Sequence, residues 1–288
     1  MKIARVFPRC VRNATPVDDL AFYDHPNVLT PRYIDKVMIS VTFTWDVKRA
    51  EELAKTWRHV APVMLGGPAL GSAGGEFVPG MFLRADMGYT ITSRGCPNSC
   101  WFCKAWQREG RTPRPIAIKD GWNVLDSNLL ACPDEHINAV FNMLERQPRR
   151  ARFTGGMESA RLKDWHVDRL ARLRPEILYL AYDTPDDREP LHRAADMLRR
   201  AELGSHRTRC YVLCGWTTAD TIGVLKDDTI DAAEARCREV ANIGIMPMAM
   251  LYDNAKSRDA SDARQWRDWR YTWADPSVVG AKMRKAKG

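Results

Sequence analysis

The chain has 288 residues, 45% of them hydrophobic, which is enough to bury a full core, so one large domain with a smaller addition is expected. Its formal net charge of +8 permits an anionic partner without requiring one. The eight cysteines are too unevenly spaced for a secreted disulfide framework, and no apolar run has membrane-spanning length. Residues 1–10 are charged and contain a proline, so no targeting segment is expected. A cytoplasmic protein that binds no membrane is therefore predicted.

The first 87 residues predict a small α/β unit. Strands are expected over residues 2–7, 37–43 and 62–65. A helix is expected over residues 46–60, because Ala50, Leu53 and Trp57 fall on one face and Asp46 can cap the start. The third strand ends at a Gly-Gly-Pro sequence, residues 66–68.

Three cysteines follow the next predicted strand. Residues 89–93 alternate and are rich in β-branched and aromatic types, which favours a strand. Cys96, Cys100 and Cys103 then form a C-x3-C-x2-C pattern. Three thiolates at this spacing can hold three irons of a cubane iron–sulfur cluster and leave the fourth iron open to a ligand that is not protein. Zinc, a disulfide and buried thiols are the alternatives, although zinc usually takes four ligands and no fourth cysteine or histidine lies at short range.

Strands and helices alternate beyond the cysteines, after an irregular, basic stretch at residues 110–120. Strands are expected over residues 123–130, 151–154, 177–181, 209–214 and 244–251. Helices are expected over residues 133–147, 164–174, 185–203 and 229–243. Counted from residue 89, this gives six strands with helices between them, which predicts a parallel sheet.

The cysteine loop resembles the signature of the radical S-adenosylmethionine (SAM) superfamily, including the aromatic Phe102 just before the third cysteine. Residues 88–253 are similar to the partial (β/α)6 barrel of that superfamily. The resemblance implies that the open iron binds the amino and carboxylate groups of SAM. It also implies that an electron from the reduced [4Fe-4S] cluster cleaves SAM to a 5′-deoxyadenosyl radical, which removes a substrate hydrogen. An external electron donor, flavodoxin-like or ferredoxin-like, is expected with this chemistry.

The first 87 residues resemble the Rossmann-like domain that precedes the barrel in cobalamin-binding radical SAM enzymes. The cobalamin pattern Asp-x-His-x-x-Gly is absent, because Asp24 and His25 are adjacent and the next histidine is His59. The expected fold is therefore α/β, with a Rossmann-like domain without cobalamin over residues 1–87. This domain is followed by a partial (β/α)6 TIM-like barrel over residues 88–255. The chain then ends with a basic, Trp-containing C-terminal helix and tail over residues 256–288.

Sites in barrels of this kind form on the loops that follow the carboxyl ends of the strands. The second predicted strand contains Asp126 and Asn128, a carboxylate and an amide that suit the SAM ammonium and ribose hydroxyls. Capping of a turn is the alternative for Asp126. The third strand leads to Gly155 and Gly156, which would let a ligand approach the backbone, and to Glu158, which we expect to face the substrate.

Later strand ends add three candidates. Asp183 follows the fourth strand as a polar group at the barrel mouth. Cys214 ends the fifth strand, where its thiol would lie near the radical. Gly215 belongs to a segment that resembles the adenine-contacting segment of the superfamily.

Residues 256–288 contain nine Lys or Arg residues. Trp266, Trp269 and Trp273 have helical spacing, which favours a helix that packs its aromatic face on the barrel. A nucleic-acid-binding surface is the alternative. The basic charge and this tail together favour a nucleotide or nucleic acid as substrate, with a small metabolite or peptide next. The competing hypothesis for the whole chain is an iron–sulfur binding or electron-transfer protein without SAM turnover.

Overall fold

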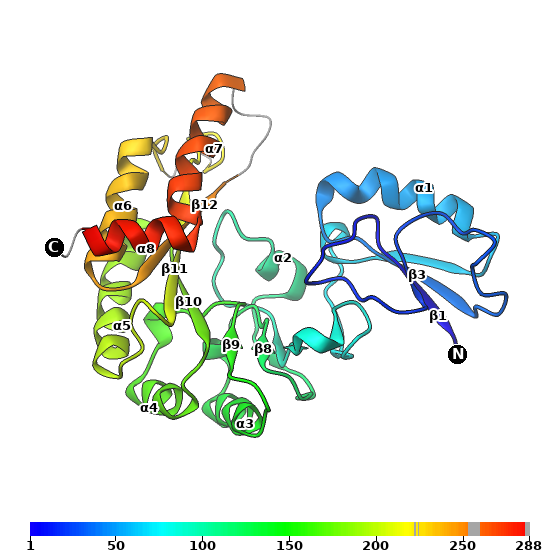
Figure 1. Ribbon diagram of the computed structural model, residues 1–288, viewed down its shortest axis with the longest axis horizontal. Coiled ribbons are helices and arrows are strands. Elements are labelled where there is room, and N and C mark those ends of the chain that lie inside the picture. The colour runs from blue at the N-terminus through cyan, green and yellow to red at the C-terminus, as the bar shows by residue number, and fades with distance from the viewer. Residues whose placement is uncertain (222, 224, 253–259, 286–288) are drawn as a thin grey trace.

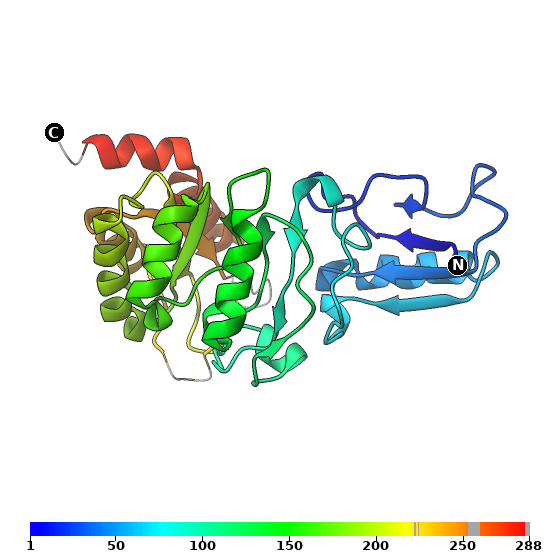
Figure 2. The same ribbon diagram turned by 90° about the horizontal axis from the view of Figure 1, so that it is seen from below.

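Two parallel sheets organise the chain. The structure is a computed structural model that describes residues 1–221, 223, 225–252 and 260–285. A four-stranded sheet near the N-terminus and a six-stranded sheet lie next to each other along the long axis of the molecule (Figure 1; Figure 2). The α/β prediction is confirmed.

The smaller sheet is covered by a helix on one face. Its parallel strands lie in the order β2-β1-β3-β4 and span Ile3–Val6 (β1), Ala21–Phe22 (β2), Lys36–Ser40 (β3) and Val63–Gly66 (β4). Leu53 and Trp57 of helix α1 (Val47–Trp57) are fully buried in one cluster with Val37 and Ile39 of β3. The three predicted strands and the helix are present. β2 was not predicted, because two residues show no periodicity.

The larger sheet follows the order of the chain. Its six strands are β5 (Tyr89–Thr90), β8 (Asn123–Val124), β9 (Arg152–Phe153), β10 (Ile177–Tyr182), β11 (Thr208–Cys214) and β12 (Met246–Leu251), each parallel to the next. Helices α3 (Asp134–Glu145), α4 (Asp164–Leu173), α5 (Arg188–Arg200) and α6 (Ile230–Asn242) connect them and lie along the outer side of the sheet (Figure 1). The predicted parallel sheet of six alternating strands is confirmed. β8 is shorter than predicted, because the chain turns into a 3-10 helix at Leu129–Ala131.

A small antiparallel pair frames the cysteine loop. β6 (Ser93–Arg94) precedes the loop and pairs with β7 (Arg114–Pro115), and the short helix α2 (Ala105–Glu109) follows the third cysteine. The predicted irregular stretch at residues 110–120 therefore contains a strand that brings the chain back to the start of the loop.

The C-terminal part forms two helices, α7 (Ala260–Ala274) and α8 (Pro276–Lys285), instead of the one expected. Trp266 and Trp273 are buried in the main core, and the Nε1 groups of Trp269 and Trp273 both donate to the carboxylate of Glu234 on α6. The tryptophans thus pack on the larger domain, as the simpler interpretation predicted. The predicted boundary at residues 255–256 lies outside the described residues. In the part of the chain that is described, no helix is long and apolar enough to cross a membrane.

Candidate functional site

The three-cysteine loop lies between β6 and α2. Cys96, Cys100 and Cys103 are each partly exposed, and none forms a disulfide. Gly95, directly before the first cysteine, has φ +90°, and a Cβ added there would lie 2.5 Å from the carbonyl oxygen of Thr112. Only glycine fits such a close backbone approach with a positive φ. The fold therefore fixes where the loop begins.

The three thiols lie close enough to influence one another electrostatically. Burial raises the pKa of the Cys100 thiol to about 11, with further contributions from Cys103, Asp183 and Cys96. At neutral pH this thiol is protonated. A bound metal would displace the proton, because a coordinated thiol is deprotonated and metal binding releases protons.

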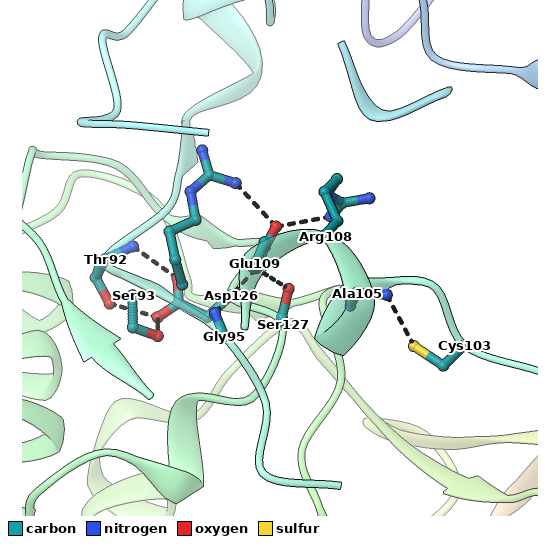
Figure 3. A network of polar contacts seen from close by, with 10 residues as sticks. Thr92, Ser93, Gly95, Cys103, Ala105, Arg108, Glu109, Asp126 and Ser127 are labelled. Carbon is teal, nitrogen blue, oxygen red and sulfur yellow. Dashed lines mark hydrogen bonds and ion pairs between the residues drawn. The ribbon is translucent and has the colours of Figure 1, made fainter. Parts of the chain in front are cut away.

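Two of the sulfurs accept N–H donors. The backbone amide of Ala105, at the start of α2, donates to Sγ of Cys103 over 3.4 Å (Figure 3). The side-chain amide of Asn128 donates to Sγ of Cys96 over 3.4 Å. Hydrogen bonds to cysteine sulfurs are one of the means by which proteins tune the potential of an iron–sulfur cluster.

Asn128 connects the cysteine loop to the end of β9. Its Nδ2 also lies 2.7 Å from Oε2 of Glu158, and Nε of Arg161 donates to the same oxygen over 2.6 Å. Within the described residues, the buried Oδ1 of Asn128 has no hydrogen-bond partner. The structure thus brings two predicted site residues together beside Cys96 and leaves a buried acceptor there that a ligand donor would satisfy.

Asp126 lies beneath the site. Asp126 is only 1% exposed. Its carboxylate oxygens accept hydrogen bonds from the amide of Thr92 over 2.7 Å and from the hydroxyls of Thr92 and Ser93 over 2.6 Å each (Figure 3). Burial raises the pKa of Asp126, although these three donors act to lower it. The carboxylate holds the turn between β5 and β6, as the capping alternative predicted. This geometry does not support the direct ligand contact expected from the sequence.

Glu109 is a functional candidate that the sequence analysis missed. Its carboxylate accepts the amide of Gly95 over 3.0 Å, the hydroxyl of Ser127 over 2.7 Å and a guanidinium N–H of Arg108 over 2.6 Å (Figure 3). Burial acts to raise the pKa of Glu109, but the bonds from Arg108, Gly95 and Ser127 outweigh it and lower the pKa. The available signal was that Glu109 is the single acidic residue among five basic ones between residues 104 and 119.

Trp101 is a second functional candidate that the sequence analysis missed. Its ring centroid lies 5.3 Å from that of Phe102, 5.1 Å from that of Tyr252 and 6.3 Å from that of Trp216. Trp216 and Tyr252 follow the ends of β11 and β12, so the cysteine loop reaches the opposite edge of the six-stranded sheet. Phe102 lies in this aromatic group. The buried Nε1 of Trp101 has no partner among the described residues.

The two predicted glycines have different surroundings. A Cβ on Gly155 would lie 2.5 Å from the carbonyl oxygen of Asp126, so this glycine allows β9 to approach the end of β8. Gly156 has φ +93°, and a Cβ there would meet no atom within 4 Å. Only Gly156 matches the expectation of open space beside the backbone.

Asp183 lies at the end of β10. Its pKa is raised to about 7, first by burial and then by the charge of Asp187, while a hydrogen bond from the amide of Leu213 acts to lower it. Asp183 also contributes to the raised pKa of Cys100, which places it near the cysteine loop. The structure therefore supports its assignment to the site region.

Cys214 is fully buried in the main core, although it ends β11 as predicted. Its thiol cannot meet a substrate without a rearrangement of that core, so the proposed catalytic role is not supported by this geometry. The neighbouring Gly215 has φ +74°, and its amide donates to the carboxylate of Asp228 over 2.7 Å.

Across the described ranges, no three His, Cys, Asp or Glu side chains converge as a single metal ion requires. A cubane cluster is held differently, because each thiolate binds its own iron and the sulfurs need not meet at one point. Partly exposed thiols, N–H donors to two sulfurs and buried polar atoms without partners are compatible with such a group and a polar ligand beside it. Comparison with models of protein families and with curated proteins finds no match for this chain.

Proposed function

We propose that this chain is a radical SAM enzyme in which Cys96, Cys100 and Cys103 bind a [4Fe-4S] cluster. The observation that carries the proposal is the connection from Cys96 through Asn128 to Glu158. It places a carboxylate and an unpartnered amide oxygen one side chain away from the first thiol. The six parallel strands are consistent with the partial (β/α)6 barrel of this superfamily, and we include that barrel in the proposal.

The bound cluster would supply one-electron reduction of SAM, from which a radical that abstracts a substrate hydrogen is formed. The chain's own groups have separate tasks. Glu158, which the sequence analysis assigned to the substrate, is proposed here to accept a charge-assisted hydrogen bond from the SAM ammonium, because Asn128 connects it to Cys96. Asn128 offers its Oδ1 to a donor on the same ligand and its Nδ2 to the sulfur of Cys96. Gly156 leaves room beside the backbone.

Two residues hold the loop without touching the ligand. Asp126 fixes the turn at Thr92 and Ser93, and Glu109 holds the amide of Gly95. Both carboxylates act on the backbone just before Cys96. They hold in place the part of the chain that leads into the first thiol.

The electron would come from a separate flavodoxin-like or ferredoxin-like donor in the cytoplasm. For the substrate, the net charge of +8 favours an anionic molecule such as a nucleotide or a nucleic acid. The buried tryptophans of α7 do not add to this argument, because their rings pack on the core.

Anaerobic reconstitution with iron and sulfide tests the proposal. We expect about four irons per chain. Replacement of Cys96, Cys100 or Cys103 by Ala should reduce the iron content strongly, whereas Cys10→Ala, an exposed cysteine outside the loop, should leave it unchanged. After reduction by dithionite, the loaded protein should release 5′-deoxyadenosine from SAM. Full iron content without that product would favour the electron-transfer alternative, and unchanged iron in all three loop variants would refute the cluster assignment.

A further inference from the structure

A second candidate site lies beside the residues that flank the cysteine loop, on the side of the smaller sheet. A cavity of about 580 Å³ lies between the smaller sheet and the start of the larger domain. Residues from both parts line it: Ser40 and Thr42 at and after the end of β3, Gly66 and Gly67 at the end of β4, residues 74–78 and 81–83, and Ile91, Arg94 and Arg108. Ligand pockets commonly have volumes of roughly 300–1,000 Å³ and lie at domain interfaces, beyond the carboxyl ends of parallel strands.

The floor of the cavity is the open face of the smaller sheet. Met38 of β3 and Met64 of β4 are partners in the strand register and line the cavity. Val37 and Ile39 are buried in the cluster that contains Leu53 and Trp57 of α1, although Ile39 also borders the cavity. All-parallel sheets are normally covered on both faces. Here Met64 remains 44% exposed on the face away from α1. Methionine adapts its shape to different apolar partners, which suits a binding surface.

One end of the cavity is cationic. Arg94 and Arg108 both contact Oε1 of Glu109, but the contact from Arg94 is long, at 3.4 Å, compared with 2.6 Å from Arg108. Among the described residues, the buried Nε of Arg94 has no partner. Two guanidinium groups therefore share one carboxylate, and Arg94 keeps an unsatisfied donor.

The one acidic residue of the lining is Glu76, which is exposed and accepts the amide of Ala117 over 3.0 Å. Its charge is in contact with solvent and is screened there. The negative charge of Glu76 therefore does not neutralise the positive charge of Arg94, whose Nε is buried. The charge at the inner end of the cavity is therefore positive.

We infer that this cavity binds an organic monoanion that has an apolar body and a carboxylate, sulfonate or phosphodiester group. The apolar body packs on Met38 and Met64, and the anionic group accepts hydrogen bonds from Arg94 and Arg108. Charge-assisted bonds to a guanidinium are the interactions that such a group forms best. The inference does not require a cluster on the thiols. Glu109 bonds to both arginines and to Gly95, so an anion here contacts the same network that holds the cysteine loop.

Two fluorescent probes test the inference. 8-Anilinonaphthalene-1-sulfonate and N-phenyl-1-naphthylamine share the same rings, and only the first has a sulfonate. The sulfonate should bind the wild-type protein about tenfold more tightly, because it gains a charge-assisted bond. Arg94→Gln should remove that difference, and Arg114→Gln, an exposed arginine outside the cavity, should keep it.

Filling the cavity should weaken both probes. A Cβ on Gly75 meets no atom within 4 Å, so Gly75→Trp adds bulk to the lining without backbone strain. Affinity for both probes should fall about tenfold or more, whereas Val28→Trp, at a site 99% exposed, should change neither. Met64→Trp provides a second filling variant, and circular dichroism establishes that each variant is folded. Equal wild-type affinity for the two probes, or retained binding in both filled variants, would overturn the inference.

Discussion

The side-chain amide of Asn128 donates to the carboxylate of Glu158 over 2.7 Å, across 30 residues of sequence. Because Asn128 follows β8 and Glu158 follows β9, the contact joins the ends of two adjacent strands. The same amide nitrogen also reaches Cys96. These three side chains define where a polar ligand of the proposed cluster would lie, and they set the first two predictions.

Glu158→Ala should weaken the binding of SAM. The loss of one charge-assisted hydrogen bond costs roughly 1.5–3 kcal/mol, which corresponds to a decrease in affinity of about ten- to a hundredfold. Anaerobic titration of SAM, followed by the electron paramagnetic resonance signal of the reduced protein, measures the affinity. Glu176→Ala, an exposed carboxylate paired with Arg152, is the control and should bind SAM normally. Normal affinity in Glu158→Ala would remove this residue from the ligand site.

Asn128→Ala should lower the reduction potential of the reconstituted protein. Without the N–H donor, the sulfur of Cys96 loses stabilisation of its added negative charge. A net hydrogen-bond contribution of about 0.5–1.5 kcal/mol corresponds to roughly 20–60 mV for one electron. A redox titration monitored by electron paramagnetic resonance gives the potential. Asn142→Ala, on the outer helix α3, should leave the potential as in the wild type; a potential unaffected by Asn128→Ala would contradict the contact.

Asp126→Ala should destabilise the fold more than it affects ligand binding directly. Three donors from Thr92 and Ser93 would lose their buried acceptor, and each buried unsatisfied group costs about 1–3 kcal/mol. Urea unfolding should therefore show a decrease of several kcal/mol relative to the wild type. Asp126→Asn keeps one acceptor oxygen and should be less destabilised than Asp126→Ala. An unchanged midpoint in Asp126→Ala would mean that the carboxylate serves a ligand instead.

These cases show which features a single sequence could predict. Alternating and helical periodicities located the strands and helices, because each pattern depends on residues a few positions apart. The role of Asp126 depends on Thr92, which is 34 residues away, and that of Trp101 depends on Trp216 and Tyr252. Such distant contacts leave no local pattern. A strand end therefore marked the right region of the molecule, but it did not distinguish a buried carboxylate from one that faces a ligand.

Protonation of His166 should destabilise the fold in acid. The imidazole is fully buried and accepts the amide of Lys163 over 3.1 Å at Nδ1. Burial, with a smaller effect of Lys163, lowers its pKa from 6.5 to about 4. The unfolded chain therefore binds more protons between these values, so stability falls as the pH decreases from about 6.5 to about 4.

The expected loss between pH 7 and pH 5 is about 2 kcal/mol. His166→Asn can keep an acceptor for Lys163 and cannot titrate, so the dependence of its unfolding free energy on pH should be smaller by this amount. His206→Asn is the matched control, since His206 is exposed in the folded chain. Equal pH dependences for His166→Asn and the wild type would contradict the prediction.

Asp183→Asn should stabilise the chain in mildly alkaline solution. The folded pKa of about 7 lies above the ordinary value of 3.8, so the folded chain binds the proton more tightly. Stability is therefore lost as the pH rises from about 4 to about 7 and is not regained above it. This difference in pKa corresponds to a loss of a few kcal/mol of stability above pH 7. Asn at position 183 carries no charge and so avoids this loss, and its side-chain oxygen still accepts a hydrogen bond from the amide of Leu213. Melting temperatures should separate at pH 8 and converge near pH 4; no separation at pH 8 would refute the assignment.

The contact of Trp101 with Trp216 and Tyr252 also matters during protein synthesis. The cysteine loop leaves the ribosome long before these two aromatic residues are translated. Between Trp101 and Tyr252 lie about 150 residues, which take roughly 8–30 s at 5–20 residues per second. For that interval the nascent chain presents three thiols whose loop lacks its packing partners.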